Sequence, residues 1–380
     1  MTNKKKSIIF INQSSGYLMI DIINAHAPYY DELILLTGYF NPRNISLNPK
    51  VKIIFLKNYV RDSFFKRLFS WIIFLLQSIF YIYFKYKKSN LYFVSNPPIF
   101  TFLPFLKNRN YSFLIYDIYP QFLVKNKLIK ESSILFRIWN WRNTIVYENA
   151  KYIFTISEGM KQNLRYLKKH KDVKVVPIWT NRDFFNFIPK DENRFLKKIN
   201  FKNEFLVAYS GNIGKSHPVE IIFDIAKFLV KEGDIKFLII GEGEKKKQIK
   251  KLQKKLNLPN LIILDFQPTE IFPHVLSAFD LGVVTLELNS SDLSVPSKTF
   301  DLMAAGKPIL SISSEDSELA KIISKSQIGK NFSVNDPIEK VASFIKELKE
   351  NKKIYKKLSE NSLKSSFDYS NINAKMLILN

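Results

Sequence analysis

Residues 296–310, PSKTFDLMAAGKPIL, combine side-chain types that can bind a phosphorylated ligand. They predict a helix that starts at Ser297 and Lys298 and carries a carboxylate, Asp301, about one turn further in. A helix N-terminus presents unpaired N–H groups and a positive dipole end, and both attract phosphate oxygens. A carboxylate one turn on can accept hydrogen bonds from two vicinal hydroxyl groups, as on a ribose. A helix with an ordinary surface Lys and Asp would have the same spacing, so this segment alone leaves both interpretations open.

The elements around this segment predict where such a site would lie. Short β-branched and aromatic runs alternate with helical stretches along the chain, which is typical of an α/β fold with parallel sheets. The predicted strands of the N-terminal series are SIIFIN, ELILLTG, VKIIFL, LYFVSN, SFLIYD and YIFTIS. The predicted strands after Arg194 are EFLVAYSG, IKFLIIGEG, LIILDF, LGVVTL and KPILSIS.

Two such series predict two doubly wound, Rossmann-like domains. We expect an N-terminal domain at residues 1–185 and a C-terminal domain at residues 186–365. Residues 366–380 are expected to pack back toward the N-terminal domain. Ligands bind such sheets at the carboxyl ends of the strands, and we expect them in the cleft between the two domains.

The composition excludes several classes of site. None of the 380 residues is cysteine, which excludes disulfides, cysteine-ligated metals and a thiol nucleophile, and fits a reducing cytoplasm. The apolar run at residues 8–11 is too short for a signal peptide. Residues 1–180 contain 27 Lys or Arg and 9 Asp or Glu, so +18 of the net charge of +24 lies there. This charge predicts an anionic neighbour, either acidic lipid headgroups, a phosphorylated substrate or nucleic acid, unless it serves solubility alone.

Residues 68–84 form an uncharged, strongly apolar run of 17 residues. A spanning helix needs roughly 20 apolar residues, and predicted strands of one sheet lie on both sides of this run. We interpret it as a crossover helix with one buried face and an outer aromatic face flanked by basic residues. Such a helix is either an ordinary core helix or one that docks on acidic headgroups; a true membrane span is the weakest alternative.

Several blocks of the chain resemble family 4 glycosyltransferases, which have two Rossmann-like domains in the GT-B arrangement. The segment PSKTFDLMAAGKPIL looks like the donor-binding helix of that family. Further similar blocks, in the same order, are LVAYSGNIGKSHPVEIIFDIA, FLIIGEGE, ILDFQPTEIFPHVLSAFDLGVVTL and SEDSELAKII. The blocks FVSNPPIF, LIYDIYPQFL and YIFTISEGMKQNL are similar to a subgroup that acts on lipid-linked sugars in surface polysaccharide assembly. The resemblance is strong over residues 207–323 and weaker before Asn96.

The resemblance implies a nucleotide-sugar donor in the C-terminal domain and transfer with retention of anomeric configuration. By position, Asp301 is implied to hold the ribose hydroxyls, while Ser297 and Lys298 hold the diphosphate. Lys215 is implied to supply a second positive charge to the leaving phosphate. The remaining implied donor-binding residues are Gly211, Asn212, Gly214, Gly241, Phe266, Pro268 and Glu318.

This chain departs from the family pattern at three places. The family has two glutamates with seven residues between them; here the second is Asp301 and the first is Leu293, with Asp292 adjacent. Asn212 replaces the family's arginine before the phosphate-binding lysine. Pro296 removes one backbone donor. The sugar is therefore not specified, and a uridine diphosphate donor is the family default.

A base or orienter for the acceptor hydroxyl is expected from the N-terminal domain. Asp117 follows the strand SFLIYD and is the best candidate, although a helix or turn cap would look the same. Gly16 after the first strand suits a loop close to phosphates or a plain turn. Glu158 and Gly159 follow the strand YIFTIS and are expected to face the same cleft. His217, beside the phosphate loop, is interpreted as a solvated loop histidine.

Together these features predict a retaining, metal-independent glycosyltransferase with no cofactor other than its donor substrate. The expected partners are a nucleotide sugar, a lipid-linked or oligosaccharide acceptor and the acidic inner face of the plasma membrane. A nucleotide-sugar 2-epimerase of the same fold is the nearest alternative, but the predicted cleft has few acid–base residues. A basic nucleic-acid-binding protein lacks any recognition motif. A non-catalytic scaffold that lost its glutamate at Leu293 is the last alternative.

Overall fold

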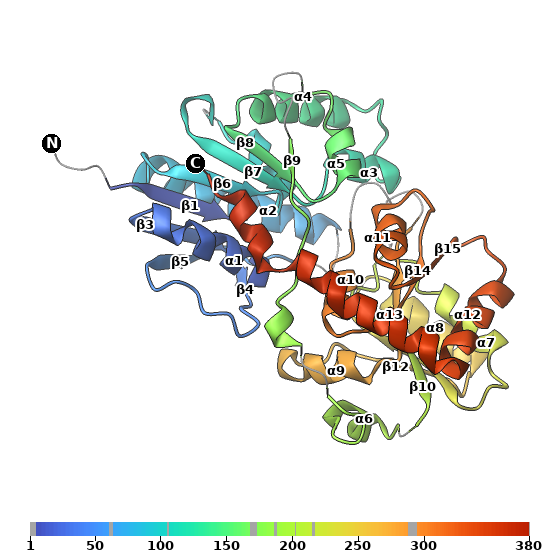
Figure 1. The fold of residues 1–380 in the computed structure, drawn as a ribbon. Coiled ribbons are helices and arrows are strands. Elements are labelled where there is room, and N and C mark those ends of the chain that lie inside the picture. Colours follow the sequence, from blue (N-terminus) through green and yellow to red (C-terminus); the bar gives the residue numbers. More distant parts are fainter. Residues whose placement is uncertain are drawn as a thin grey trace. The chain divides into compact units, whose positions relative to one another are not determined.

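The computed structural model describes residues 5–60, 64–104, 106–167, 173–185, 188–201, 203–214, 217–287 and 295–379. The chain forms two compact units (Figure 1). The first unit contains Met1–Ile178 together with Asn371–Asn380, and the second contains Trp179–Ser370. The sequence placed the boundaries after residues 185 and 365; the units divide after Ile178 and after Ser370.

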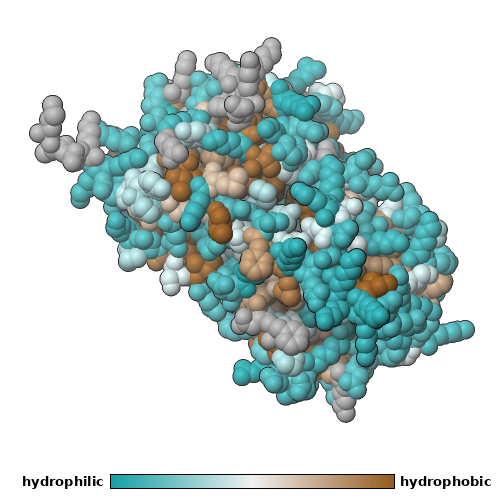
Figure 2. Space-filling view, in the orientation of Figure 1, coloured by the Kyte–Doolittle hydropathy of each residue, from teal (hydrophilic) through white to brown (hydrophobic). Residues whose placement is uncertain are grey.

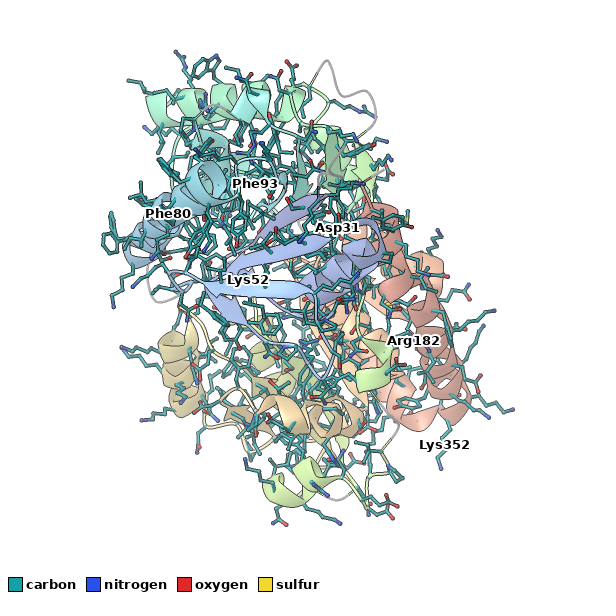
Figure 3. The ribbon with its side chains drawn as sticks, turned by 90° about the vertical axis from the view of Figure 1, so that its left-hand side faces the viewer. Asp31, Lys52, Phe80, Phe93, Arg182 and Lys352 are labelled. Carbon is teal, nitrogen blue, oxygen red and sulfur yellow. The ribbon has the colours of Figure 1, made fainter. Side chains whose placement is uncertain are left out.

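The first unit is built on a seven-stranded parallel sheet. Its strands, in spatial order, are β5 (Val51–Phe55), β3 (Glu32–Thr37), β1 (Ser7–Ile11), β6 (Asn90–Val94), β7 (Tyr111–Ile115), β8 (Tyr152–Thr155) and β9 (Lys174–Val175). Its helices are α1 (Tyr17–His26), α2 (Phe64–Phe80), α3 (Gln121–Lys125), α4 (Ile134–Glu148) and α5 (Glu158–Asn163). The central strands are apolar on both faces, as expected when helices cover a parallel sheet, and Phe93 of β6 points into this core (Figure 3).

The second unit is built on a six-stranded parallel sheet. Its strands, in spatial order, are β12 (Leu261–Leu264), β11 (Ile235–Ile240), β10 (Phe205–Ser210), β13 (Leu281–Thr285), β14 (Ile309–Ile312) and β15 (Gly329–Phe332). Its helices are α6 (Arg194–Ile199), α7 (Ile221–Phe228), α8 (Lys246–Leu256), α9 (Phe272–Ala278), α10 (Lys298–Ala304), α11 (Glu318–Ser326), α12 (Ile338–Glu350) and α13 (Lys352–Ser365).

These sheets confirm the predicted α/β class and all eleven predicted strands. The strands β9 and β15 and the helices α12 and α13 were not among the predicted elements. The sequence of β15, GKNF, has one large apolar residue and therefore no strand-like pattern. The exposed side chains over α13 are mostly hydrophilic (Figure 2).

The last residues of the chain complete the first unit. The 3₁₀ segment η9 (Asn371–Leu377) packs against α1. The backbone N–H of Leu379 donates to Nε2 of His26 at 3.4 Å. His26 is fully buried, and its Nδ1 donates to the carbonyl of Ile22 at 2.7 Å, so the neutral ring serves as both donor and acceptor.

The apolar run of residues 68–84 forms most of α2 and the π-helix that continues it, η2 (Tyr81–Lys85). This helix connects β5 to β6, two strands of the same sheet. Residues Phe65–Lys85 are long and apolar enough to cross a membrane by length and composition, and only 28% of their most apolar window is buried. The helix therefore combines a crossover position with an unusually exposed apolar surface.

Candidate donor-binding site

Lys298 is the first residue of α10 and brings its ammonium group to the end of β10. The Nζ atom lies 3.7 Å from the centroid of the Tyr209 ring, within the range of a cation–π interaction. That atom is buried and has no hydrogen-bond partner within the described part of the chain. Burial lowers the pKa of Lys298 to about 7, because an ammonium group without an anion is poorly solvated there. The site thus contains a buried cationic group that has no counterion among the residues that the structure describes.

Two glycines let the backbone approach Lys298 closely. Gly211 follows β10 with φ of +151°, a conformation that favours glycine, and a Cβ there would lie 2.6 Å from Lys298 Nζ. Gly241 follows β11, and a Cβ there would lie 2.0 Å from the Gly211 oxygen. Tyr209 and Ser210 pair with Ile239 and Ile240, which aligns the carboxyl ends of both strands. The glycine loops therefore meet at the edge where doubly wound sheets bind ligands.

The loop after Gly211 is fixed by hydrogen bonds. The Tyr209 hydroxyl donates to the carbonyl of Asn212 at 2.6 Å. Ile213 N donates to Glu242 O at 2.8 Å. A Cβ at Gly214 would lie 2.8 Å from the Asn212 side-chain amide. Gly211, Asn212, Gly214 and Gly241 therefore lie in one connected loop region, which reaches Lys298 through Gly211.

His217 lies in this cluster and is not the solvated loop residue that the sequence suggested. Its Nδ1 donates to the carbonyl of Thr285, at the end of β13, at 2.8 Å. Burial, followed by the nearby charge of Lys298, lowers the pKa of His217 to about 3. The ring is therefore neutral near pH 7, and its Nε2 carries the lone pair.

Asp301 lies one turn into α10 and is 5% exposed. The hydroxyl of Thr180 donates to its Oδ1 at 2.6 Å. Thr180 is itself held by its N–H, which donates to the carbonyl of Tyr369 at 3.1 Å. Neither Thr180 nor Tyr209 was singled out from the sequence, because Thr180 lies 121 residues before Asp301 and Tyr209 is an ordinary strand residue by pattern.

The remaining predicted donor residues are spread over three further elements. Ser297, at the N-cap of α10, is exposed. Glu318 is the first residue of α11, and its Oε1 accepts from Lys321 Nζ at 3.1 Å. Phe266, 47% exposed, and Pro268 follow β12. Lys215, Asp292 and Leu293 lie outside the described residues.

The predicted acceptor-side residues belong to the first unit. Asp117 follows β7, its N–H donates to Ser95 Oγ at 3.3 Å, and burial raises the pKa of its carboxyl to about 6. Glu158 is exposed at the start of α5, with Gly159 next to it in the helix. Gly16 is the N-cap of α1. A Cβ at this position would lie 3.7 Å from its nearest atom, so there is room for a side chain and a glycine is not sterically required.

No group of three or more His, Asp or Glu side chains suited to a metal occurs in the described ranges. The residues around Lys298 are suited to a nucleoside diphosphate. They offer a buried ammonium group, close approach of the backbone and a carboxylate one turn further along α10. These features lie at the carboxyl ends of parallel strands, an arrangement that is typical of nucleotide-binding α/β proteins.

Comparison with known proteins makes this class more specific. Residues 190–365 match the family Glycosyl transferases group 1. The chain is 27% identical over 226 residues to WbjE of Pseudomonas aeruginosa, which is named as a probable glycosyltransferase, and the match covers 59% of this chain and 56% of WbjE. It is 30% identical over 104 residues to WcaI of Escherichia coli K12, which is named for colanic acid biosynthesis, with 27% and 25% covered.

The chain spans about half the length of WbjE and a quarter of WcaI. Its fold is also that of HepE from Anabaena, solved in complex with UDP-glucose, with a TM-score of 0.69 and 12% identity. That superposition covers 98% of this chain and 97% of HepE. The fold is therefore GT-B, with two Rossmann-like domains.

Proposed function

We propose that this protein is a retaining glycosyltransferase of surface polysaccharide biosynthesis. It moves a hexosyl or N-acetylhexosaminyl group from a nucleotide diphosphate sugar, by default a UDP-sugar, to a lipid-linked or saccharide acceptor. The family match of residues 190–365 and the naming of WcaI support the reaction and its pathway. UDP-glucose in the similarly folded HepE supports the donor class.

The observation that carries the proposal is the buried, unneutralised Nζ of Lys298 beside Gly211. In the reaction, the bond between the anomeric carbon and the phosphate oxygen breaks, and the electron pair stays on the diphosphate. A cation and N–H groups already in place stabilise that developing charge without reorganisation, and each such donor typically contributes about 2.7–4 kcal/mol. Lys298, together with the start of α10, supplies them here, so the proposed reaction requires no metal.

The acceptor hydroxyl oxygen forms the new bond to the anomeric carbon and loses its proton. We assign Asp117 as the base or orienter for that hydroxyl, since a carboxylate with a pKa near 6 is ionised at neutral pH yet still basic. The proposed place of action is the cytoplasmic face of the plasma membrane, where lipid-linked acceptors are reached.

A thermal-shift screen of nucleoside diphosphates and nucleotide sugars tests the donor site directly. Ligand binding to the folded state raises the melting temperature by mass action, and the correct base should raise it most. Lys298→Met should abolish the shift, whereas Lys356→Met should preserve it because that side chain is 78% exposed on α13. Transfer of sugar from the best ligand to an extracted lipid-linked acceptor, with EDTA present, then tests the reaction. No shift with any nucleotide would refute the proposal.

A further inference from the structure

The outward face of α2 and its π-helical continuation is a continuous apolar stripe. Its members recur every three or four residues, so they lie on one side of the helix. All are exposed, by 42–81%, and they are Phe65, Phe69, Ile72, Leu76, Phe80 and Phe84. Phe80 points away from the unit in Figure 3. The opposite face of the helix buries Trp71 and Phe74. The helix therefore packs on the first unit through that face, and the apolar stripe is not used in this packing.

A second stripe of the same kind lies on α4. Ile134, Ile138, Trp141 and Ile145 follow the same helical spacing and are 37–75% exposed, with Leu135 beside them at 50%. The inner face of α4 buries Trp139 and Val146. Contiguous exposed apolar patches on a protein surface often mark a binding site for another molecule.

The two helices are neighbours. The ring of Tyr119 lies 5.9 Å from that of Trp71 on α2 and 5.8 Å from that of Trp139 on α4. Trp71 and Trp139 belong to one apolar cluster, and both helices also pack on the 3₁₀ segment η3 (Pro98–Phe102). One aromatic ring thus contacts the inner faces of both helices, so α2 and α4 lie near each other in the first unit.

The charges around the stripes are almost all positive. Residues 61–142 contain 13 Lys or Arg and 3 Asp or Glu, a net charge of +10. Exposed basic residues at the ends of the stripes are Lys66, Lys85, Lys87, Lys88, Lys127, Lys130 and Arg137. Within α2 there is no acidic residue, and α4 has only Glu148 at its last position. An apolar face with a basic border is complementary to an anionic bilayer interface.

We propose that α2 and α4 together form the surface by which this protein docks peripherally on an acidic membrane. The choice of a bilayer as occupant rests on the proposed function, because a lipid-linked acceptor resides there. The same aromatic cluster connects this surface to the acceptor side, since Tyr119 lies two residues after Asp117. Docking through both helices therefore fixes the Asp117 loop relative to the bilayer through Tyr119.

Trp141 provides an intrinsic reporter for this proposal. The other three tryptophans, Trp71, Trp139 and Trp179, are 2–5% exposed, whereas Trp141 is 58% exposed. Vesicles of mixed phosphatidylcholine and phosphatidylglycerol should shift its emission to the blue, and brominated acyl chains should quench it. Trp141→Phe should remove both signals without removing binding. Vesicles of phosphatidylcholine alone should bind much less because the basic border then lacks a partner.

Paired variants separate the two helices. Phe69→Ser/Leu76→Ser on α2 and Ile134→Ser/Ile138→Ser on α4 should each weaken co-sedimentation with the acidic vesicles by about tenfold or more. Phe228→Ser, an exposed apolar residue of α7 in the second unit, should leave it unchanged. All variants should keep the wild-type melting temperature, because the replaced side chains are at the surface.

Several outcomes would overturn the proposal. These are no vesicle binding, binding unaffected by either pair, or dependence on α2 alone with an unquenched Trp141. A stable dimer in solution that the α4 pair converts to monomer would instead assign the surface to a second copy. The binding assay contains no donor, and the nucleotide-induced thermal shift is measured separately, so failure of docking and failure of the proposed function are distinguishable.

Discussion

The ammonium group of Lys298 lies 3.7 Å above the ring of Tyr209, at the point where β10 ends and the loop of Gly211 begins. An aromatic face attracts a cation but does not neutralise it. The pKa of Lys298 is therefore lowered by burial to about 7, and the group is partly deprotonated near neutral pH. A diphosphate bound at the same place would restore the charged form.

Nucleotide binding should therefore be coupled to proton uptake. At about pH 8, most of the free protein has neutral Lys298, and a bound diphosphate should raise its pKa well above that value, so about one proton is taken up per nucleotide. Isothermal titration calorimetry in buffers with different ionisation enthalpies measures this number.

Lys298→Arg is the matched variant, because a guanidinium group stays charged at this pH. It should bind nucleotide with almost no proton uptake, while Lys298→Met should bind much more weakly. Uptake that persists in the arginine variant would assign the proton to another group.

Gly211→Ala should damage the donor loop. The backbone there has φ of +151°, and the added methyl carbon would lie 2.6 Å from Lys298 Nζ. We expect a loss of about 1–3 kcal/mol in the free energy of unfolding from strain, together with a smaller nucleotide-induced thermal shift. Gly233→Ala is the control, since no atom lies within 4 Å of its added carbon. Urea unfolding curves of the two variants decide the matter, and equal effects would argue against the close approach at Gly211.

We expect the carboxylate of Asp301 to recognise the ribose hydroxyls of the nucleotide. If its carboxylate holds the ribose, wild-type protein should bind UDP about 10- to 100-fold more tightly than 2′,3′-dideoxy-UDP, the range expected for hydrogen bonds to a charged group. Asp301→Asn should lose most of that preference. Thr180→Val is informative as well, because the Thr180 hydroxyl donates to Oδ1 at 2.6 Å and orients the carboxylate. A preference for ribose that survives in Asp301→Asn would place the contact elsewhere.

Asp117 should give the transfer rate a pH dependence on the acidic side. Burial raises the pKa of this carboxyl to about 6, and the proposed base acts only when ionised. The rate at saturating donor should therefore fall as pH decreases below about 6. Asp117→Asn should be slow at all pH values and lack this limb. An unchanged acidic limb in that variant would exclude Asp117 as the titrating group.

The fold could be predicted because the relevant signals are local. Runs such as FLVAYS and FLII are continuous and apolar, as buried parallel strands require, and their strands β10 and β11 lie where the pattern placed them. The element β15 could not be predicted, since a short edge strand with the sequence GKNF has no periodic signal and forms by pairing with β14.

Residues of the candidate site that belong to a sequence motif could be predicted. The side chains that support them from distant parts of the chain could not. Lys298 and Gly211 were identified from sequence blocks, and the structure brings them together. Tyr209 and Thr180 contribute through tertiary contacts that no spacing encodes. His217 shows the same limit: its position suggested a solvated loop, but its hydrogen bond to Thr285 depends on how β13 lies beside β10.

The buried His26 should make the protein less stable at mildly acidic pH. Burial lowers the pKa of His26 from its ordinary value of 6.5 to about 4 in the folded chain. The unfolded state then binds more protons between these two values, so stability falls as pH decreases from about 6.5 toward 4. At about pH 5, protonation of His26 should cost about 2 kcal/mol relative to pH 7.5.

His26→Gln removes this titration while keeping a donor and an acceptor for Ile22 O and Leu379 N–H. The variant should be less stable than wild type at neutral pH, because the buried ring packs against Phe10 and Tyr92. Its loss of stability between about pH 7.5 and 5 should nevertheless be about 2 kcal/mol smaller than that of wild type. His217 titrates in the same direction in both proteins, so only the difference between their urea-unfolding pH profiles reports on His26. Parallel profiles would show that the pKa of His26 is not lowered in the folded chain and that its protonation does not limit stability.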